Sequence, residues 1–324
     1  MSAGATAIIE RLGAEQGHPA VTYRQAGDRA VLVEFGEMEF DLTLNFFVLA
    51  FDAALREHSV DGLVETAPGF RSMLVTYDPR ETSAHDLVED IARVQAALPE
   101  EREIEIPSRL IRLPIAFDDS QSRAAVERYV HTIRADAPNC EGDNNIDYIV
   151  RYNGYANREA FFDAVLATEH WTGFIGFFPG LPFMFPLDPR YVPIVPKYNP
   201  TRTWTPEGAV GLGGPCQAIY PVESAGGYQL YGRSLPVYDL QGRNAVFRDN
   251  PLLLRPGDRV RFHRVEEQEL LALFDDVRAD RYVYEIDDQP LDVGEYRESL
   301  ERHRDEAEQW RRSRDEAAAR TPVP

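Results

Sequence analysis

The sequence predicts an α+β protein made of a small α/β subdomain, a β-barrel and a helical tail. Three observations predict this class. Strand-like and helix-like periods alternate from residue 21 to 115, short strands and Gly/Pro turns crowd residues 171–235, and a charged helical pattern follows residue 265. With 324 residues, 44% of them hydrophobic, the chain is long enough to bury a large core.

The first part begins after a small, polar stretch, residues 1–20, which we expect to be a flexible arm. A strand at residues 30–35 precedes a helix in "LTLNFFVLAFDAALREH", for which Asp41 or Thr43 is a suitable cap. Two strands flank the Pro-Gly turn of "VDGLVETAPGFRSMLVTYDP", a second helix begins after Ser83, and "IEIPSRLIRLPIAF" is strand-like. Residues 21–115 therefore predict the β-α-β-β-α-β order of a ferredoxin-like subdomain.

Residues 116–170 predict a helical segment with two helices, in "SRAAVERYVHTIRADA" and "REAFFDAVLATEH", and a turn with a short strand between them. Residues 171–265 predict the barrel, because turn signals recur between short strands and "LLLRPGDRVRFHRV" ends in an alternating strand. The tail covers residues 266–324. It carries a narrow apolar stripe that predicts a helix lying along another surface, formed by Tyr296, Leu300, Ala307 and Trp310.

Composition excludes several function classes. The formal charge of −20 disfavours binding to nucleic acid. No apolar run reaches 18 residues, so we expect no membrane span, and the N-terminus lacks the pattern of a secretory signal. The two cysteines need not pair, so we expect a reducing cytoplasm. The two cysteines fit no zinc spacing, no histidine pair has ligand spacing, and we expect no metal site. His170, at the end of a predicted helix, is expected to be a helix-end cation.

Lys197 is the only lysine among 34 basic residues, so 33 are arginine. Lysine is a compact charge with a tunable pKa, whereas arginine is a planar fork with a fixed charge. We therefore interpret Lys197 as retained for chemistry; the alternative is that one lysine survived by chance. The segment "KYNPTRTW" makes Lys197, Asn199 and Arg202 the candidate catalytic residues, with Tyr198 beside them, because they can neutralise an oxyanion or hold a carboxylate. The alternative interpretation is an Arg202–Glu207 salt bridge with Trp204 in the core.

Two glycine-rich stretches add candidate substrate-binding residues. In "GFIGFFPGLPFM", Gly176 and Gly180 permit a rigid loop that aims amide N–H groups at an oxygen atom, although a purely structural loop is the alternative. In "YPVESAGGYQLYGRS" the candidates are Glu223, Gly226, Gly227 and Gln229, and Glu223 by itself is a weak signal.

Long blocks of the chain resemble the carboxyltransferase subdomain C/D family. They include "VTYRQAGDRAVLVEFGEMEFDL", "KYNPTRTWTPEGAVGLGG", "YPVESAGGYQLYGRS" and "LLLRPGDRVRF". That family includes the B-type subunit of 5-oxoprolinase, proteins labelled allophanate hydrolase subunit 1, a bacterial sporulation-kinase inhibitor and the carboxyltransferase part of urea carboxylase, to which the resemblance is strongest. The resemblance implies a small α/β subdomain followed by a cyclophilin-like β-barrel. One loop departs from it: "GFIGFFPGLP" stands where urea carboxylases carry an acid-containing loop, and is similar to the GFxPGFPY loop of the B-type 5-oxoprolinase subunit.

The resemblance implies one subunit of a carboxyltransferase that moves a carboxyl group from carboxybiotin to an amide or urea-like nitrogen. It also implies partners: a subdomain A/B subunit (allophanate hydrolase subunit 2 type), and a biotin carboxylase with a biotin carrier protein, so that biotin and ATP are used on other chains. A lone lysine in "PKYN" does not fit a biotin-attachment site. Two alternatives stay open: the B-type subunit of an ATP-dependent 5-oxoprolinase-like lactam hydrolase, and a non-catalytic regulator that binds a kinase.

Overall fold

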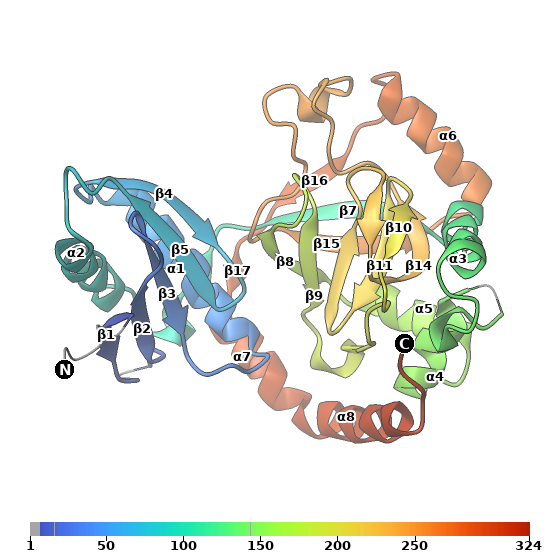
Figure 1. The fold of residues 1–324 in the computed structure, drawn as a ribbon, viewed down its shortest axis with the longest axis horizontal. Coiled ribbons are helices and arrows are strands. Elements are labelled where there is room, and N and C mark those ends of the chain that lie inside the picture. The colour runs from blue at the N-terminus through green and yellow to red at the C-terminus, as the bar shows by residue number, and fades with distance from the viewer. Residues whose placement is uncertain (1–6, 16, 143) are drawn as a thin grey trace. The chain divides into compact units, whose positions relative to one another are not determined.

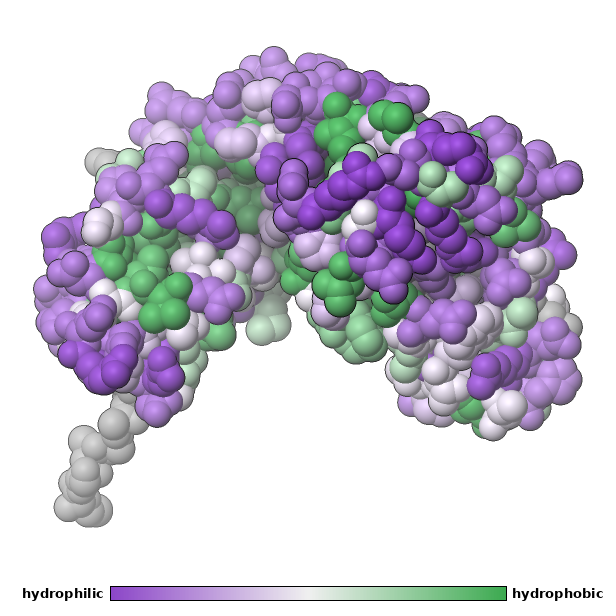
Figure 2. Space-filling model, turned by 90° about the horizontal axis from the view of Figure 1, so that it is seen from above, coloured by the Kyte–Doolittle hydropathy of each residue, from purple (hydrophilic) through white to green (hydrophobic). Residues whose placement is uncertain are grey.

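The computed structural model describes residues 7–15, 17–142 and 144–324 (Figure 1). The chain forms two compact units. The first comprises Met1–Pro107 with Pro290–Glu298, and the second comprises Ser108–Gln289 with Ser299–Pro324. Hydrophilic side chains cover most of the surface visible in Figure 2, and hydrophobic ones gather in separate places. No helix in the described part of the chain is long and apolar enough to cross a membrane.

The first unit is an antiparallel sheet with two helices packed on one face (Figure 1). The strand order is β1-β2-β3-β5-β4, with bounds β1 Ile8–Leu12, β2 Val21–Gln25, β3 Ala30–Phe35, β4 Leu63–Pro68 and β5 Ser72–Tyr77. The helices are α1 Leu42–Glu57 and α2 Ala84–Ala96. Asp41 caps α1 by accepting the Thr43 amide at 2.9 Å, and Ser83 caps α2.

Two details of this unit differ from the sequence-based expectation. Part of the expected arm is the edge strand β1, which pairs with β2; residues 1–6 and 16 lie outside the described part. The strand expected to finish the subdomain at residue 115 is divided. Its start, β6 Glu105–Ile106, pairs with β17 Leu291–Asp292, whereas β7 Arg109–Phe117 enters the other unit. Periodicity indicates a strand but not the sheet that it joins, and β2 occupies the place beside β3.

The second unit contains a closed barrel of seven strands, which confirms the predicted fold class (Figure 1). The order is β14-β11-β12-β9-β8-β15-β7, and β7 pairs back to β14. The bounds are β8 His170–Ile175, β9 Pro182–Pro186, β11 Ala209–Gly213, β12 Cys216–Ile219, β14 Gln229–Ser234 and β15 Arg259–Arg264. Strand β16 Glu285–Asp288 extends the sheet from β7, and β10 Arg202–Thr205 pairs with β13 Ser224–Gly226 beside the barrel.

Helices pack against this barrel and against one another. They are α3 Ser120–Thr132, α4 Ile146–Asn153, α5 Arg158–Ala167, α6 Glu267–Arg278 and α8 Arg304–Ala319, while α7 Val293–Arg302 begins in the first unit. Short 3-10 turns lie at Glu101–Glu103, Pro138–Cys140, Pro189–Tyr191 and Ala245–Phe247. The short strand expected between α3 and α5 was wrong: α4 is helical, with Ile146 and Ile149 buried one turn apart and Gly154 ending it at φ 72°.

The apolar stripe of the tail does pack on other surfaces, but it is not one continuous helix. In the first unit, Tyr296 lies edge-on to Phe46 with 5.1 Å between the ring centroids. The helix breaks at His303, and in the second unit Ala307 is buried while Trp310 packs against Tyr155 at 4.8 Å. A stripe of this width is typical of a helix that covers a neighbour.

Candidate functional site

Six of the predicted site residues lie on two segments that hydrogen bonds join in the second unit. The Tyr198 amide donates to the Gly227 carbonyl at 2.7 Å, and the Gln229 side-chain amide donates to the Pro196 carbonyl at 2.8 Å. Arg202 lies opposite Gly226 in the ladder between β10 and β13. Hydrogen bonds therefore join the segment that contains Lys197 to the Gly-Gly stretch that precedes β14.

Lys197 is exposed, and its ammonium nitrogen lies 5.3 Å from the centre of the Tyr228 ring. No carboxylate lies within ion-pair distance of this ammonium among the residues that the structure describes. An aromatic face attracts a cation by about 0.5–1 kcal/mol at an exposed site, which orients the ammonium without neutralising it. The ammonium of the only lysine is therefore exposed and remains available to an anion.

The Tyr228 ring that supports Lys197 is itself buried, and its hydroxyl contacts the Cys216 thiol. Burial raises the pKa of Cys216 to about 12 and raises the pKa of Tyr228 as well. A thiol with such a pKa stays protonated near neutral pH, which disfavours a nucleophilic role for Cys216.

Arg202 is almost completely buried, with 1% of its surface exposed. It donates to the Tyr228 carbonyl at 2.6 Å and to the Thr205 hydroxyl at 3.2 Å, and its guanidinium lies 4.4 Å from the centre of the Tyr198 ring. The guanidinium has no carboxylate partner among the described residues, and its Nε makes no hydrogen bond. Burying an uncompensated charge is costly, so this position calls for an explanation.

The Arg202–Glu207 salt bridge of the alternative interpretation does not form. Glu207 pairs with Arg278 at 3.3 Å, and Trp204 is half-buried with the Arg128 guanidinium over its ring at 5.8 Å. The expected use of Arg202 as a carboxylate clamp stays a prediction. One guanidinium nitrogen of Arg202 already donates a hydrogen bond to the carbonyl of Tyr228, whose ring lies under Lys197.

Tyr198 supports the site from inside. Its buried hydroxyl donates to the Asn145 side-chain oxygen at 2.8 Å and accepts from the Cys140 thiol at 3.4 Å, and burial raises the pKa of Tyr198. Asn145 also accepts the Leu230 amide at 2.9 Å. The hydroxyl is thus committed to the protein interior, and the predicted substrate contact of Tyr198 would have to use another part of the residue.

Sequence reasoning missed the amides on which this support depends. The Asn145 side chain donates to the Asn139 carbonyl at 2.7 Å, and the Asn139 side chain donates to the Gln229 side-chain oxygen at 3.0 Å. Both asparagines are buried. The stretch "PNCEGDNN" offered a signal, since three asparagines in one loop are more than a solvated turn requires.

The other predicted residues lie around this centre with different degrees of contact. A Cβ atom at Gly226 would lie 2.4 Å from the Tyr220 hydroxyl, so only glycine fits there, and Gly227 lies against Thr201 and Lys197. Asn199 is exposed, and its carbonyl accepts from Arg134 at 2.9 Å. Glu223 is exposed beside β13. The roles of Asn199 and Glu223 stay predictions.

The stretch "GFIGFFPGLP" forms the tip of the hairpin between β8 and β9. Gly176 donates its amide to the Leu181 carbonyl at 3.2 Å, and Gly180, at φ 77°, packs against Tyr238 and Leu252. Where the strands lead into this loop, Phe174 stacks on Phe183 at 4.4 Å, and Phe183 lies edge-on to Tyr228 at 6.5 Å. The hairpin therefore reaches the ring that carries Lys197, while the predicted role of Gly176 and Gly180 in binding an oxygen atom stays a prediction.

His170 is not the helix-end cation that the sequence suggested. Its ring is fully buried at the start of β8, where Nε2 lies 3.0 Å from the Val165 carbonyl oxygen. Burial lowers the pKa of His170 to about 4, so the ring is neutral near pH 7. Position after a helix suggested a charge, but only tertiary burial decided the protonation state.

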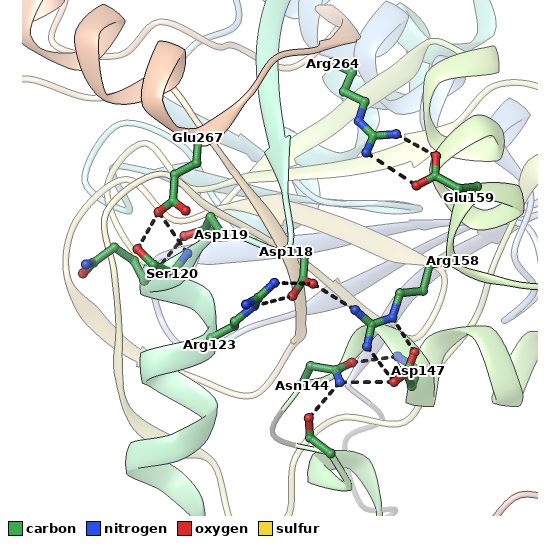
Figure 3. Close-up of polar contacts among 12 residues, drawn as sticks. Asp118, Asp119, Ser120, Arg123, Asn144, Asp147, Arg158, Glu159, Arg264 and Glu267 are labelled. Carbon is green, nitrogen blue, oxygen red and sulfur yellow. Dashed lines mark hydrogen bonds and ion pairs between the residues drawn. The ribbon is translucent and has the colours of Figure 1, made fainter.

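A second polar cluster, which the sequence did not indicate, lines a cleft of about 510 Å³ at the ends of α3, α4 and α5 (Figure 3). Asp118 accepts from Arg123 at 2.9 and 2.7 Å and from Arg158 at 2.9 Å, and Arg158 also donates to Asp147 at 2.6 and 2.7 Å. Asp118 has a φ of 55°, a conformation that only a few residue types adopt readily. In this cluster both guanidinium groups have carboxylate partners.

Comparison with known proteins places the chain in a family. Residues 21–247 match the model of the carboxyltransferase domain, subdomain C and D. The chain is 35% identical over 278 residues to urea amidolyase of Lachancea kluyveri, covering 86% of this chain but 15% of that protein. It is 31% identical over 254 residues to the B-type subunit of 5-oxoprolinase from Bacillus subtilis, covering 76% of this chain and 94% of that protein.

A solved structure agrees. The Kluyveromyces lactis urea carboxylase matches 98% of this chain with a TM-score of 0.86 and 32% identity, and the match spans 29% of that longer chain. The Lys197 segment, the Gly226–Gly227 stretch and most of the barrel lie within the matched family region. The chain therefore belongs to the family of the carboxyltransferase domain, subdomains C and D.

Proposed function

We propose that this chain is one subunit of a carboxyltransferase of the urea carboxylase type, which moves a carboxyl group from carboxybiotin to an amide or urea-like nitrogen. The observation that carries the proposal is the pair of cations Lys197 and Arg202. In a chain with 54 acidic residues, neither has a carboxylate partner among the described residues, and both rest on tyrosine rings. Cations without counterions suit a site where negative charge develops on oxygen.

The roles of the residues follow from their placement. Lys197, exposed over Tyr228, would neutralise an oxyanion or a carboxylate, and Asn199, two residues on, has both an amide donor and a carbonyl acceptor. Arg202 is buried behind them and would act through the Tyr228 backbone and its own positive charge. Carboxybiotin supplies the activated carboxyl group when it is bound, and the absence of an acid beside Lys197, among the residues that the structure describes, fits a group of that charge.

Other chains would supply the remaining machinery. The chain spans 15% of the urea amidolyase that it matches and 29% of the urea carboxylase, so much of those proteins has no counterpart here. We propose a carboxyltransferase subdomain A/B subunit as the direct partner, with a biotin carboxylase and a biotin carrier protein as the source of carboxybiotin at the expense of ATP. The loop "GFIGFFPGLP" has no acid to hold the amide nitrogens of urea, which favours a different amide as substrate.

Reconstitution tests this proposal. The chain would be mixed with a purified A/B subunit, a biotin carboxylase and its biotinylated carrier, and ATP, bicarbonate and a panel of amides would be supplied. We expect bicarbonate-dependent carboxylation that avidin abolishes. Amide turnover that needs ATP but neither bicarbonate nor biotin would contradict the proposal.

That contrary result is the signature of the second candidate, the B-type subunit of an ATP-dependent 5-oxoprolinase-like lactam hydrolase. Two observations favour it. The match to the Bacillus subtilis 5-oxoprolinase subunit spans 94% of that relative, and the hairpin loop resembles the loop of such subunits. Avidin would have no effect on this activity, and a cyclic amide would be opened rather than carboxylated, so one experiment separates the two.

A further inference from the structure

We propose that the tip of the β8–β9 hairpin, centred on Phe177, together with Leu240 on the adjoining loop, is the docking surface for the polypeptide that completes the carboxyltransferase. The identity of that polypeptide rests on the proposed function. The evidence for the surface itself is the exposure of the two side chains, the backbone conformation of the turn and the contact between the two loops.

A hydrogen-bonded turn keeps the side chain of Phe177 exposed to solvent. Its side chain is 71% exposed, and its backbone φ of 65° lies in the left-handed region, which is unfavourable for a bulky residue. The turn is closed by hydrogen bonds from the Phe178 amide to the Gly176 carbonyl at 2.7 Å and from the Leu181 amide to the Phe178 carbonyl at 3.0 Å. A strained backbone that displays a large apolar ring to solvent suggests a function rather than a packing role.

A second large apolar side chain lies on the loop that braces this turn. A Cβ atom on Gly180 would meet Leu252 at 3.0 Å and Tyr238 at 3.1 Å, so the two loops are in contact. Tyr238 and Leu252 also pair with each other across a bridge, and Leu240, two residues after Tyr238, is 76% exposed. Exposed apolar side chains that stand singly need no explanation. Phe177 and Leu240 differ from such cases because the two loops that carry them are in contact.

The occupant that fits is another subunit of the same enzyme. The matched urea amidolyase and urea carboxylase hold most of their length outside the region shared with this chain, and a relative of similar length is called a subunit. The hairpin also connects the tip to the candidate site, because Phe183, beside the loop, packs against Tyr228 under Lys197. A partner bound to Phe177 would therefore contact the hairpin that packs against the ring under Lys197.

The chemistry of the partner surface follows from these loops. An exposed aromatic ring on a rigid turn inserts into an apolar pocket, and such anchors dominate binding between proteins. The formal charge of −20 on this chain favours a partner face whose rim is neutral or basic, since like charges across an interface are repulsive.

The test measures binding and catalysis separately in the full-length chain. Phe177→Asn removes the ring while keeping a residue that tolerates positive φ, and Leu240→Ser is combined with it. Val283→Ser is the matched control, since Val283 is 84% exposed in the same compact unit. Titration calorimetry against the purified A/B subunit should show a dissociation constant raised by about 30-fold in the double variant and unchanged in the control, as expected for the loss of an anchor.

Thermal unfolding of each free variant checks that the chain still folds. An unchanged dissociation constant with a raised KM would overturn the proposal, because Phe177 would then contact substrate. A wild-type chain that does not bind the A/B subunit would also overturn it. Because the titration needs neither substrate nor biotin, loss of binding in the double variant would support the surface even if the assembled enzyme proved to hydrolyse lactams.

Discussion

The second unit has two cation-rich regions, and they differ in whether their cations are paired with carboxylates. At the ends of α3, α4 and α5, Arg123 and Arg158 share Asp118, and Arg158 also binds Asp147 (Figure 3). Lys197, before β10, and Arg202, its first residue, have no acidic partner among the described residues and rest on Tyr228 and Tyr198 instead.

The difference separates a structural role from a chemical one. A guanidinium bound to carboxylates on both sides has no charge left to offer, and its role is to connect the β7 end with the neighbouring helices. A cation on an aromatic ring is oriented but not neutralised. We therefore expect substitutions in the first region to change stability and substitutions in the second to change catalysis.

The largest expected effect is on Lys197. Lys197→Arg keeps the charge but replaces a compact ammonium with a planar fork, and we expect kcat of the reconstituted enzyme to fall by about 10²-fold, as when a donor to a developing oxyanion is lost. The side chain is exposed, so the melting temperature should not change. Arg123→Lys makes the reverse exchange in the paired region and should retain full activity; equal turnover in both variants would remove the distinction between the regions.

The next effect is on stability and concerns a group in neither region. The folded-state pKa of His170 is lowered from 6.5 to about 4, so the unfolded chain binds a proton first as the pH falls. Stability from this residue is complete above pH 6.5 and is lost as the pH falls towards 4, by about 3 kcal/mol in total. Urea unfolding at pH 7.5 and 4.5 should show a smaller acid loss in His170→Gln than in the wild type. The stabilities of variants in the two cation-rich regions should therefore be compared above pH 6.5, where His170 does not change them.

Arg202→Met tests whether the buried cation also holds the fold. The Tyr228 carbonyl would lose its donor, and we expect the free energy of unfolding to fall by about 2 kcal/mol. Activity should fall by more than the loss of folded protein explains, because the residue behind Lys197 would shift. If Arg202→Met unfolded at higher urea concentration than the wild type, the cost of the uncompensated charge would exceed the value of its hydrogen bonds.

The smallest effect is expected from Asp118→Asn, which keeps a residue suited to φ 55° but removes the shared negative charge. We expect about 1 kcal/mol of lost stability by urea unfolding and unchanged turnover. Glu159→Gln, which weakens the exposed Arg264–Glu159 pair at 2.6 Å, is the matched control and should have a smaller effect. If Asp118→Asn lost activity at unchanged stability, the cluster around Asp118 would be part of the catalytic site.

The sequence alone predicted the outline of the fold because its signals are local. Cap residues Asp41 and Ser83, the apolar spacing of α1 and α2, and the turn-rich stretch from residue 171 each act within a few residues of the chain. It also singled out Lys197, because one lysine among 34 basic residues is a property of composition. The family resemblance rested on the order of long blocks, and the match to residues 21–247 confirmed it.

Only the tertiary structure decided what depends on partners distant in sequence. It placed β7 in the barrel, made α4 a helix, and left His170 neutral, since each outcome depends on burial against segments far along the chain. The asparagine-rich stretch marked Asn139 and Asn145 as unusual, but their role as supports was not predictable because their partners Gln229 and Tyr198 lie more than 50 residues away. Residue type fixes which charge a side chain can carry, but its neighbours in space decide whether that charge is used inside the protein or remains for a ligand.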